Sequence, residues 1–211
     1  MNRAVNRIEG LYAVTPDDTD SARLLTRVRA ALAGGVRLVQ YRNKVADAAQ
    51  RLQQATALCA LCRDYDAALI VNDDVALALA VDAHGLHLGR EDGSIAAARA
   101  RIGPDKLLGA SCYRDLANAE RALAEGADHI AFGSFFVSTV KPGAVRSSPS
   151  LLTEAKRKFG VPVVAIGGIT VDNASVLINA GADSVAVITA LFSAPDIAQA
   201  ARDFSALFKT R

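Results

Sequence analysis

The chain has 211 residues, of which 51% are hydrophobic and 22% are charged, and this balance excludes a disordered chain or a coiled coil. A formal net charge of +2 and only 5% aromatic residues give no reason to expect nucleic acid or an anionic membrane as a partner. No apolar run approaches the ~20 residues of a membrane helix, the N-terminal residues do not resemble a signal peptide, and three cysteines make no secreted disulfide framework. We therefore expect a cytoplasmic protein, and a homodimer is compatible with the sequence.

Short apolar runs alternate with Ala-, Leu- and Arg-rich helical patterns along the chain. The runs predict strands at Leu11–Thr15, Leu38–Arg42, Ala68–Asn72, Gly85–Leu88, Leu107–Ser111, His129–Gly133, Val161–Gly167 and Ser184–Thr189. The patterns between them predict helices at Ser21–Ala33, Ala46–Arg63, Asp74–Ala80, Ser94–Arg101, Asp115–Ala124, Ser150–Phe159, Asp172–Asn179 and Pro195–Phe208.

Continuous apolar strands that alternate with helices indicate a parallel sheet covered on its faces. Eight units of about 26 residues predict an α/β protein with a single (β/α)8 (TIM) barrel domain over residues 1–211. A doubly wound open sheet is the main rival, but no G-x-G-x-x-G follows the first strand. In a barrel the active site lies at the carboxyl ends of the strands, so the polar residues there are the candidates for function.

Three polar side chains follow one another at alternate positions at the end of the second predicted strand. Gln40, Arg42 and Lys44 point the same way because a strand has a period of two residues. Two cations converging in a cleft are what a phosphate or diphosphate requires. The alternative is an ordinary solvated strand end.

Carboxylates follow the next two predicted strands. Asn72 and Asp73 end the third strand, and Asp92 follows the fourth. Carboxylates from adjacent strand ends can share one Mg²⁺, which takes one or two of them together with substrate phosphate oxygens. Both aspartates also precede helical stretches, so helix capping is the competing interpretation.

Glycines and a long loop mark the other side of the barrel. Gly168 lies in a Gly-Gly pair after the seventh strand, and Ile188 and Thr189 end the eighth. The loops after these two strands often cradle phosphate with backbone N–H groups. The irregular stretch 134–149 follows strand six and contains Lys141, which predicts an active-site flap.

The remaining histidines and cysteines give weaker signals. His87 faces the barrel mouth in this interpretation, whereas His129, at the start of strand six, should lie at the opposite end. The pair Cys59 and Cys62 falls in the middle of a predicted helix without a second pair, so we expect both thiols to pack as small hydrophobic groups. Two anion sites and a magnesium site indicate an enzyme that joins two phosphorylated small molecules or exchanges groups between them.

Several segments, in order along nearly the whole chain, resemble the thiamine-phosphate synthase family. They are L-Y-A-V-T at 11–15, Q-Y-R-N-K at 40–44, I-V-N-D at 70–73, G-L-H-L-G-R-E-D at 85–92, G-A-S at 109–111, S-T-V-K at 138–141 and A-I-G-G-I at 165–169. Members are transferases that couple a hydroxymethylpyrimidine diphosphate to a thiazole phosphate, or its carboxylate, and release pyrophosphate. The resemblance implies that the C–O bond to the diphosphate ionises before the thiazole nitrogen attacks.

The resemblance also implies roles for individual residues. The pyrimidine diphosphate would be held by Gln40, Arg42, Lys44, Asn72, His87, Ser111 and Lys141. Of these, Lys141, Ser111 and Arg42 would act at the reacting centre. Mg²⁺ would be bound by Asp73 and Asp92, and the thiazole phosphate by Ser138, Gly168, Ile188 and Thr189.

The sequence departs from the family pattern at three places. Val140 replaces a hydroxyl residue of the usual P-T-x-T-K segment, Tyr113 stands where a histidine is frequent, and Thr189 replaces a common serine. A related thiazole tautomerase is the runner-up, but its members tend to carry a histidine directly after the strand-six glycine, where this chain has Ser134. The third alternative is a non-catalytic barrel that binds a phosphorylated ligand.

Overall fold

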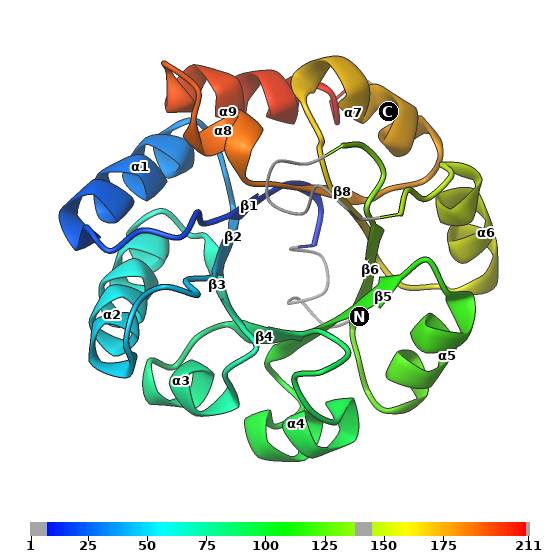
Figure 1. Ribbon diagram of the computed structural model, residues 1–211, viewed down its shortest axis with the longest axis horizontal. Helices are drawn as coiled ribbons and strands as arrows, with labels where there is room; N and C mark the ends of the chain where they lie inside the picture. The colour runs from blue at the N-terminus through cyan, green and yellow to red at the C-terminus, as the bar shows by residue number, and fades with distance from the viewer. Residues whose placement is uncertain (1–7, 138–144, 210–211) are drawn as a thin grey trace.

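Eight parallel strands close into a barrel in the computed structural model, which describes residues 8–137 and 145–209 (Figure 1). The strands are β1 (Gly10–Val14), β2 (Leu38–Tyr41), β3 (Ala68–Asn72), β4 (Gly85–Leu88), β5 (Leu107–Tyr113), β6 (His129–Gly133), β7 (Val163–Ile166) and β8 (Ser184–Val187). Each strand pairs with the next, and β1 pairs with β8. The predicted barrel is therefore confirmed.

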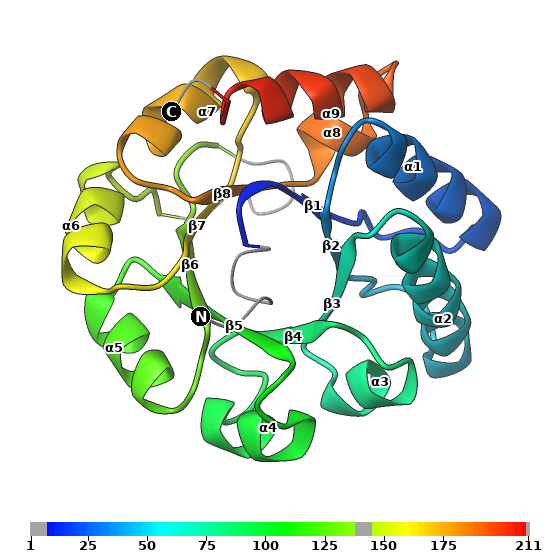
Figure 2. The same cartoon turned by 180° about the vertical axis from the view of Figure 1, so that it is seen from behind.

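Helices surround the barrel, and Figure 2 shows the same ring from behind. They are α1 (Ser21–Ala33), α2 (Ala48–Asp64), α3 (Val75–Ala80), α4 (Ile95–Ile102), α5 (Leu116–Ala124), α6 (Ser150–Lys158), α7 (Val171–Asn179), α8 (Thr189–Phe192) and α9 (Ile197–Ala206). The short helix α8 was not predicted; it begins where the sequence suggested that strand eight would end. In the described part of the chain, every helix is too short or too polar to cross a bilayer.

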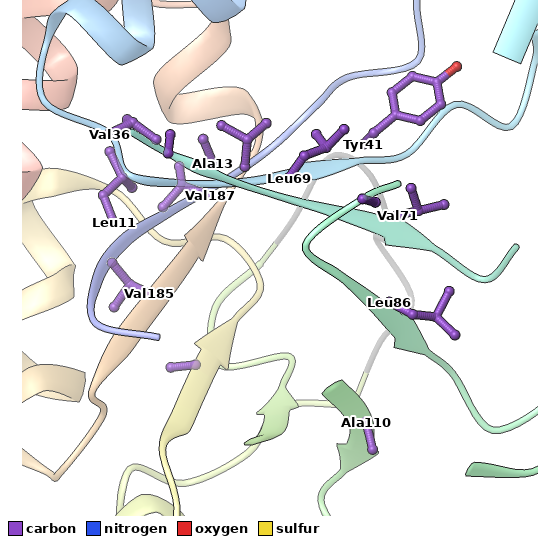
Figure 3. Packing of buried hydrophobic residues seen from close by; sticks show 14 of the residues in the cluster. Leu11, Ala13, Val36, Tyr41, Leu69, Val71, Leu86, Ala110, Val185 and Val187 are labelled. Carbon is purple, nitrogen blue, oxygen red and sulfur yellow. The ribbon is translucent and has the colours of Figure 1, made fainter. Parts of the chain in front are cut away.

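The strands are apolar on both faces because each face is covered. Outward side chains, some of which Figure 3 labels, pack between the strands and the helices, among them Leu11, Val71 and Leu86. Inward side chains such as Tyr12 and Ile70 fill the barrel itself. This double burial explains why the strands appear in the sequence as unbroken apolar runs.

Helix α2 contains two of the three cysteines. Cys59 and Cys62 are both buried, and neither forms a disulfide. Burial raises the pKa of the Cys62 thiol to about 12, so this sulfur stays protonated and unreactive at neutral pH. The expectation that the two thiols pack as small hydrophobic groups is confirmed.

Candidate active site

Gln40 is fixed from inside the barrel by a tyrosine of the neighbouring strand. Its side chain is 6% exposed, and its Nε2 donates a hydrogen bond of 3.0 Å to the Tyr12 hydroxyl. Burial raises the pKa of Tyr12, which keeps the phenol neutral. The remaining hydrogen-bonding groups of the Gln40 amide are therefore held in one orientation near the carboxyl end of β2.

The residues that follow β2 are organised by Thr15 and Asp17. The backbone N–H of Arg42 donates to Thr15 Oγ1 at 2.9 Å, and Arg42 Nη1 lies 3.0 Å from both carboxylate oxygens of Asp17. Asp17 also accepts the backbone N–H of Lys44 at 2.7 Å. Sequence reasoning missed Asp17, although its place two residues after the first predicted strand was an available signal.

Lys44 reaches across to the next strand end. Its Nζ lies 2.6 Å from Oδ2 of Asp73, with the lysine half-exposed and the aspartate less so. Asp73 has a φ of 65°, in the left-handed region that residues other than glycine rarely adopt. Such strained backbone is retained where a side chain must point in a particular direction, and here it follows Asn72, the last residue of β3.

The Asp92 carboxyl lies beside that of Asp73. Partial burial raises the pKa of Asp92, and the neighbouring Asp73 carboxyl raises it further by a hydrogen bond and by its charge. Gly89 works against this effect by donating its backbone N–H to Asp92 Oδ2 at 2.9 Å. Two carboxyl groups from adjacent strand ends are thus brought together, as the sequence predicted.

Helix capping does not account for these two aspartates. Asp74 caps α3, accepting the N–H of Leu77, and Ser94 caps α4 in the same way. Asp73 and Asp92 stand next to or near these caps without making the capping bonds. Among the described residues no cluster of three or more His, Cys, Asp or Glu side chains is suited to a metal ion. Two carboxylates nevertheless fit Mg²⁺, which completes its shell with water and substrate phosphate oxygens.

His87 and Ser111 meet on the inner face of the barrel. His87 Nε2 lies 2.9 Å from Ser111 Oγ, and the histidine is only 6% exposed. His129 is the first residue of β6, at the amino end of that strand as the sequence predicted. Its backbone pairs with Gly109, which pairs with His87, and its ring nevertheless lies 5.8 Å from that of His87. The contact between the two rings depends on the register of three strands, which the sequence of a single strand cannot reveal.

The ends of β7 and β8 offer mainly backbone groups. Gly168 has a φ of 64°, and a Cβ at this position would collide with the carbonyl oxygen of Val137. The carbonyl of Ile188 accepts the N–H of Phe192 at 2.9 Å, and Thr189 is the first residue of α8. Glycine is therefore required after β7. The predicted thiazole-phosphate residues Gly168, Ile188 and Thr189 lie at neighbouring strand ends.

Two predicted site residues, Ser138 and Lys141, lie outside the described residues, as does the departure at Val140. Tyr113, the second departure, ends β5 with a φ of 57° and is 40% exposed. The guanidinium of Arg90 lies over its ring, 4.9 Å from the centroid. Tyr113 thus packs against the loop that carries Asp92, and it forms a cation–π contact that a neutral histidine would make less well.

The polar groups gather at the carboxyl ends of the strands, where (β/α)8 barrels carry out chemistry, so fold and site together define a barrel enzyme. A family model described as thiamine monophosphate synthase matches residues 11–191. The chain is 56% identical over 201 residues to the thiamine-phosphate synthase of Methylobacillus flagellatus, covering 95% of this chain and 96% of that one. It is 55% identical over 199 residues to the enzyme of the same name from Thiobacillus denitrificans, covering 94% of each.

A solved structure agrees with the sequence relatives. The thiamine phosphate pyrophosphorylase from Pyrococcus furiosus superposes with a TM-score of 0.86 and 35% identity, covering 97% of both chains. The chain therefore belongs to the thiamine monophosphate synthase family, and it is a transferase.

Proposed function

We propose that the protein couples a hydroxymethylpyrimidine diphosphate to a thiazole phosphate, or to its carboxylate, and releases thiamine monophosphate and pyrophosphate. The observation that carries this proposal is the arrangement of Lys44, Asp73 and Asp92 at adjacent strand ends. A cation and two carboxylates at one place suit a metal-bound diphosphate better than a simple phosphate ester. Family membership supports the choice of the two substrates.

The diphosphate end is assigned to Arg42, Lys44 and Lys141, which offer three positive charges to a leaving group that gains charge as its bond breaks. The pyrimidine is assigned to Gln40, Asn72 and His87, whose neutral polar groups suit a neutral ring. Gln40 and His87 are held by Tyr12 and Ser111, so their orientation is set before the substrate arrives. Preorganised groups of this kind stabilise a transition state without reorganising during the reaction.

The C–O bond to the diphosphate breaks with its electron pair leaving on the diphosphate oxygen, and the thiazole nitrogen lone pair then forms the new C–N bond. Asp73 and Asp92 would hold Mg²⁺, which when bound neutralises the diphosphate charge. Arg42 and Ser111 would donate to the same leaving group. The thiazole phosphate is assigned to Ser138, Gly168, Ile188 and Thr189, on the opposite side of the barrel mouth.

The test is an assay with both substrates and Mg²⁺ that follows thiamine monophosphate and pyrophosphate together. We expect equal amounts of the two products and no activity after chelation. Asp73→Asn should abolish most turnover, whereas Asp74→Asn, one residue further, keeps a capping side chain on α3 and should behave as the wild type. Isomerisation of a thiazole carboxylate phosphate without coupling would point to the tautomerase. Binding of either substrate without turnover would point to a non-catalytic barrel that binds a phosphorylated ligand.

A further inference from the structure

Two buried histidines face each other across a glycine inside the barrel. His87 on β4 is in register with Gly109 on β5, and Gly109 is in register with His129 on β6. The two imidazole centroids are 5.8 Å apart. His129 is fully buried, and no part of the proposed reaction uses it.

Three ring nitrogens of this pair lack partners among the residues that the structure describes. They are His87 Nδ1 and both nitrogens of His129, all of which are buried. A buried polar atom without a hydrogen bond is unfavourable, and proteins usually satisfy such atoms with an ordered water molecule. The second ring nitrogen of His87, Nε2, does have a partner, because it lies 2.9 Å from Ser111 Oγ.

Gly109 has no side chain, and the two rings close over it. A Cβ on this residue would lie no more than 2.5 Å from both His87 Nδ1 and His129 Nε2. The two nitrogens are therefore at most about 5 Å apart, a separation that one water molecule with two hydrogen bonds of about 2.9 Å can bridge. These two unpartnered nitrogens are the smallest number of polar atoms that holds a buried water.

We propose that a buried water molecule lies over Gly109, bridges His87 Nδ1 and His129 Nε2, and makes His129 a positioning residue for Ser111. The inference rests on the proposed function, because Ser111 is taken to face the diphosphate. To donate its O–H to an anion, Ser111 must accept the Nε2–H of His87. Nδ1 of His87 must then accept a hydrogen bond, and the water supplies it while donating its second proton to His129.

The protonation state of both rings agrees with this chain of hydrogen bonds. Burial lowers the pKa of His87 to about 4, against a smaller opposing effect of the Asp73 charge, and lowers that of His129 to about 3. Both imidazoles are therefore neutral at pH 7, and each keeps one nitrogen that accepts a hydrogen bond.

The tautomer of His87 is the property to measure, by NMR of protein labelled with ¹⁵N-histidine. The chain has only 3 histidines, so single variants assign the signals. In the wild type we expect one tautomer of His87, protonated at Nε2. His129→Phe keeps an aromatic ring but removes the acceptor, and it should give mixed tautomers and a kcat about tenfold lower with KM little changed. His129→Gln, which retains an acceptor, should restore part of both.

Gly109→Ala provides an independent variant, since its methyl group would lie within 2.5 Å of both ring nitrogens, forces the rings to shift and so breaks the bridge while both histidines remain. It should change the His87 tautomer in the same way as His129→Phe. The matched control is His84→Asn, because His84 lies before β4 and accepts the backbone N–H of Leu69, a bond that asparagine can also accept. This variant should leave the His87 tautomer and kcat unchanged.

A crystal structure of the wild type should show a solvent peak within hydrogen-bond distance of both ring nitrogens. Absence of that peak, or a wild-type tautomer and kcat in a folded His129→Phe protein, would overturn the proposal. If His129→Phe does not fold, the solvent peak and the wild-type tautomer decide the question. A wild type that makes no thiamine monophosphate would refute the proposed function instead, and the NMR and crystallographic results would still stand.

Discussion

The Asp17 carboxylate holds the Arg42 guanidinium, with each of its oxygens 3.0 Å from Nη1. The same carboxylate accepts the backbone N–H of Lys44 at 2.7 Å, so one side chain positions two residues of the proposed diphosphate site. A partly exposed ion pair of this kind contributes only about 0–1 kcal/mol to stability. Its main effect is therefore on the direction in which the two cations point.

Asp17→Asn should accordingly weaken substrate binding more than it weakens the fold. The change removes the charge that holds Arg42 but keeps an oxygen for the Lys44 N–H. We expect KM for the pyrimidine diphosphate to rise about three- to tenfold, the equivalent of about 1 kcal/mol, with little change in Tm. Steady-state kinetics and thermal melts measure both quantities. Asp20→Asn, which keeps a cap on α1, is the control; an unchanged KM in Asp17→Asn would contradict the positioning role.

Asp92→Asn tests the magnesium site. The variant loses one of the two carboxylates, so we expect half-maximal activity at a Mg²⁺ concentration about ten- to a hundredfold higher than in the wild type. Titration of activity with Mg²⁺ measures this shift. Glu91→Gln, a neighbouring exposed residue, is the matched control and should leave the requirement unchanged. A wild-type Mg²⁺ dependence in Asp92→Asn would remove this residue from the site.

Asp92→Asn should make the metal-free protein more stable, although it weakens the proposed magnesium site. Because the folded protein raises the pKa of Asp92, it binds that proton more tightly than the unfolded chain does. Stability therefore falls as pH rises through the ordinary pKa of the carboxyl towards the raised one, and the charged pair remains unfavourable at neutral pH. Without metal, Asp92→Asn should melt above the wild type at pH 7, and the difference should vanish in acid. A lower Tm at pH 7 would show that the carboxyl pair is not strained.

The barrel could be predicted because each strand is marked by residues that are adjacent in the sequence. Strands β3, β4 and β6 have the predicted bounds, since each is a short and mainly apolar run. Strand β7 begins at Val163 and not at the predicted Val161, and it ends before Gly167 because that residue, with a φ of 108°, leaves the extended conformation. Helix α8 was missed because four residues are too few for a helical period to show.

The site was predictable only where its residues are close in sequence. The alternation of Gln40, Arg42 and Lys44 follows from the period of one strand. Asp17 could not be paired with Arg42 in advance, because the contact joins residues 25 positions apart. The contact between the His87 and His129 rings depends on the register of three strands, which the sequence of any one of them does not contain.

Lys141→Ala is a prediction that rests on the sequence alone. If Lys141 neutralises the leaving diphosphate, its loss should lower kcat on the order of a hundredfold or more, as removal of a preorganised group at developing charge does. Tm should change little, because a lysine rarely contributes to a hydrophobic core. The control is Lys158→Ala, which removes an exposed ion pair with Glu120. Equal losses of activity and thermal stability would contradict the assignment.

The two barrel histidines set a limit on stability in acid. Burial lowers the pKa of His87 to about 4 and that of His129 to about 3, so the unfolded chain binds protons near pH 6.5 that the folded protein does not. Stability is therefore complete above that pH and falls as pH drops towards the folded values, by up to about 1.4 kcal/mol per pH unit for each histidine.

His129→Phe should remove one of these two contributions. The free energy of unfolding, measured by urea titration between pH 7 and pH 5, should then fall with a slope smaller by up to about 1.4 kcal/mol per pH unit than in the wild type. His84→Asn supplies the comparison, since His84 is not enclosed in the barrel interior with the other two. If the His129→Phe slope equals that of the wild type, His129 titrates normally in the folded protein, and its burial as a neutral ring is refuted.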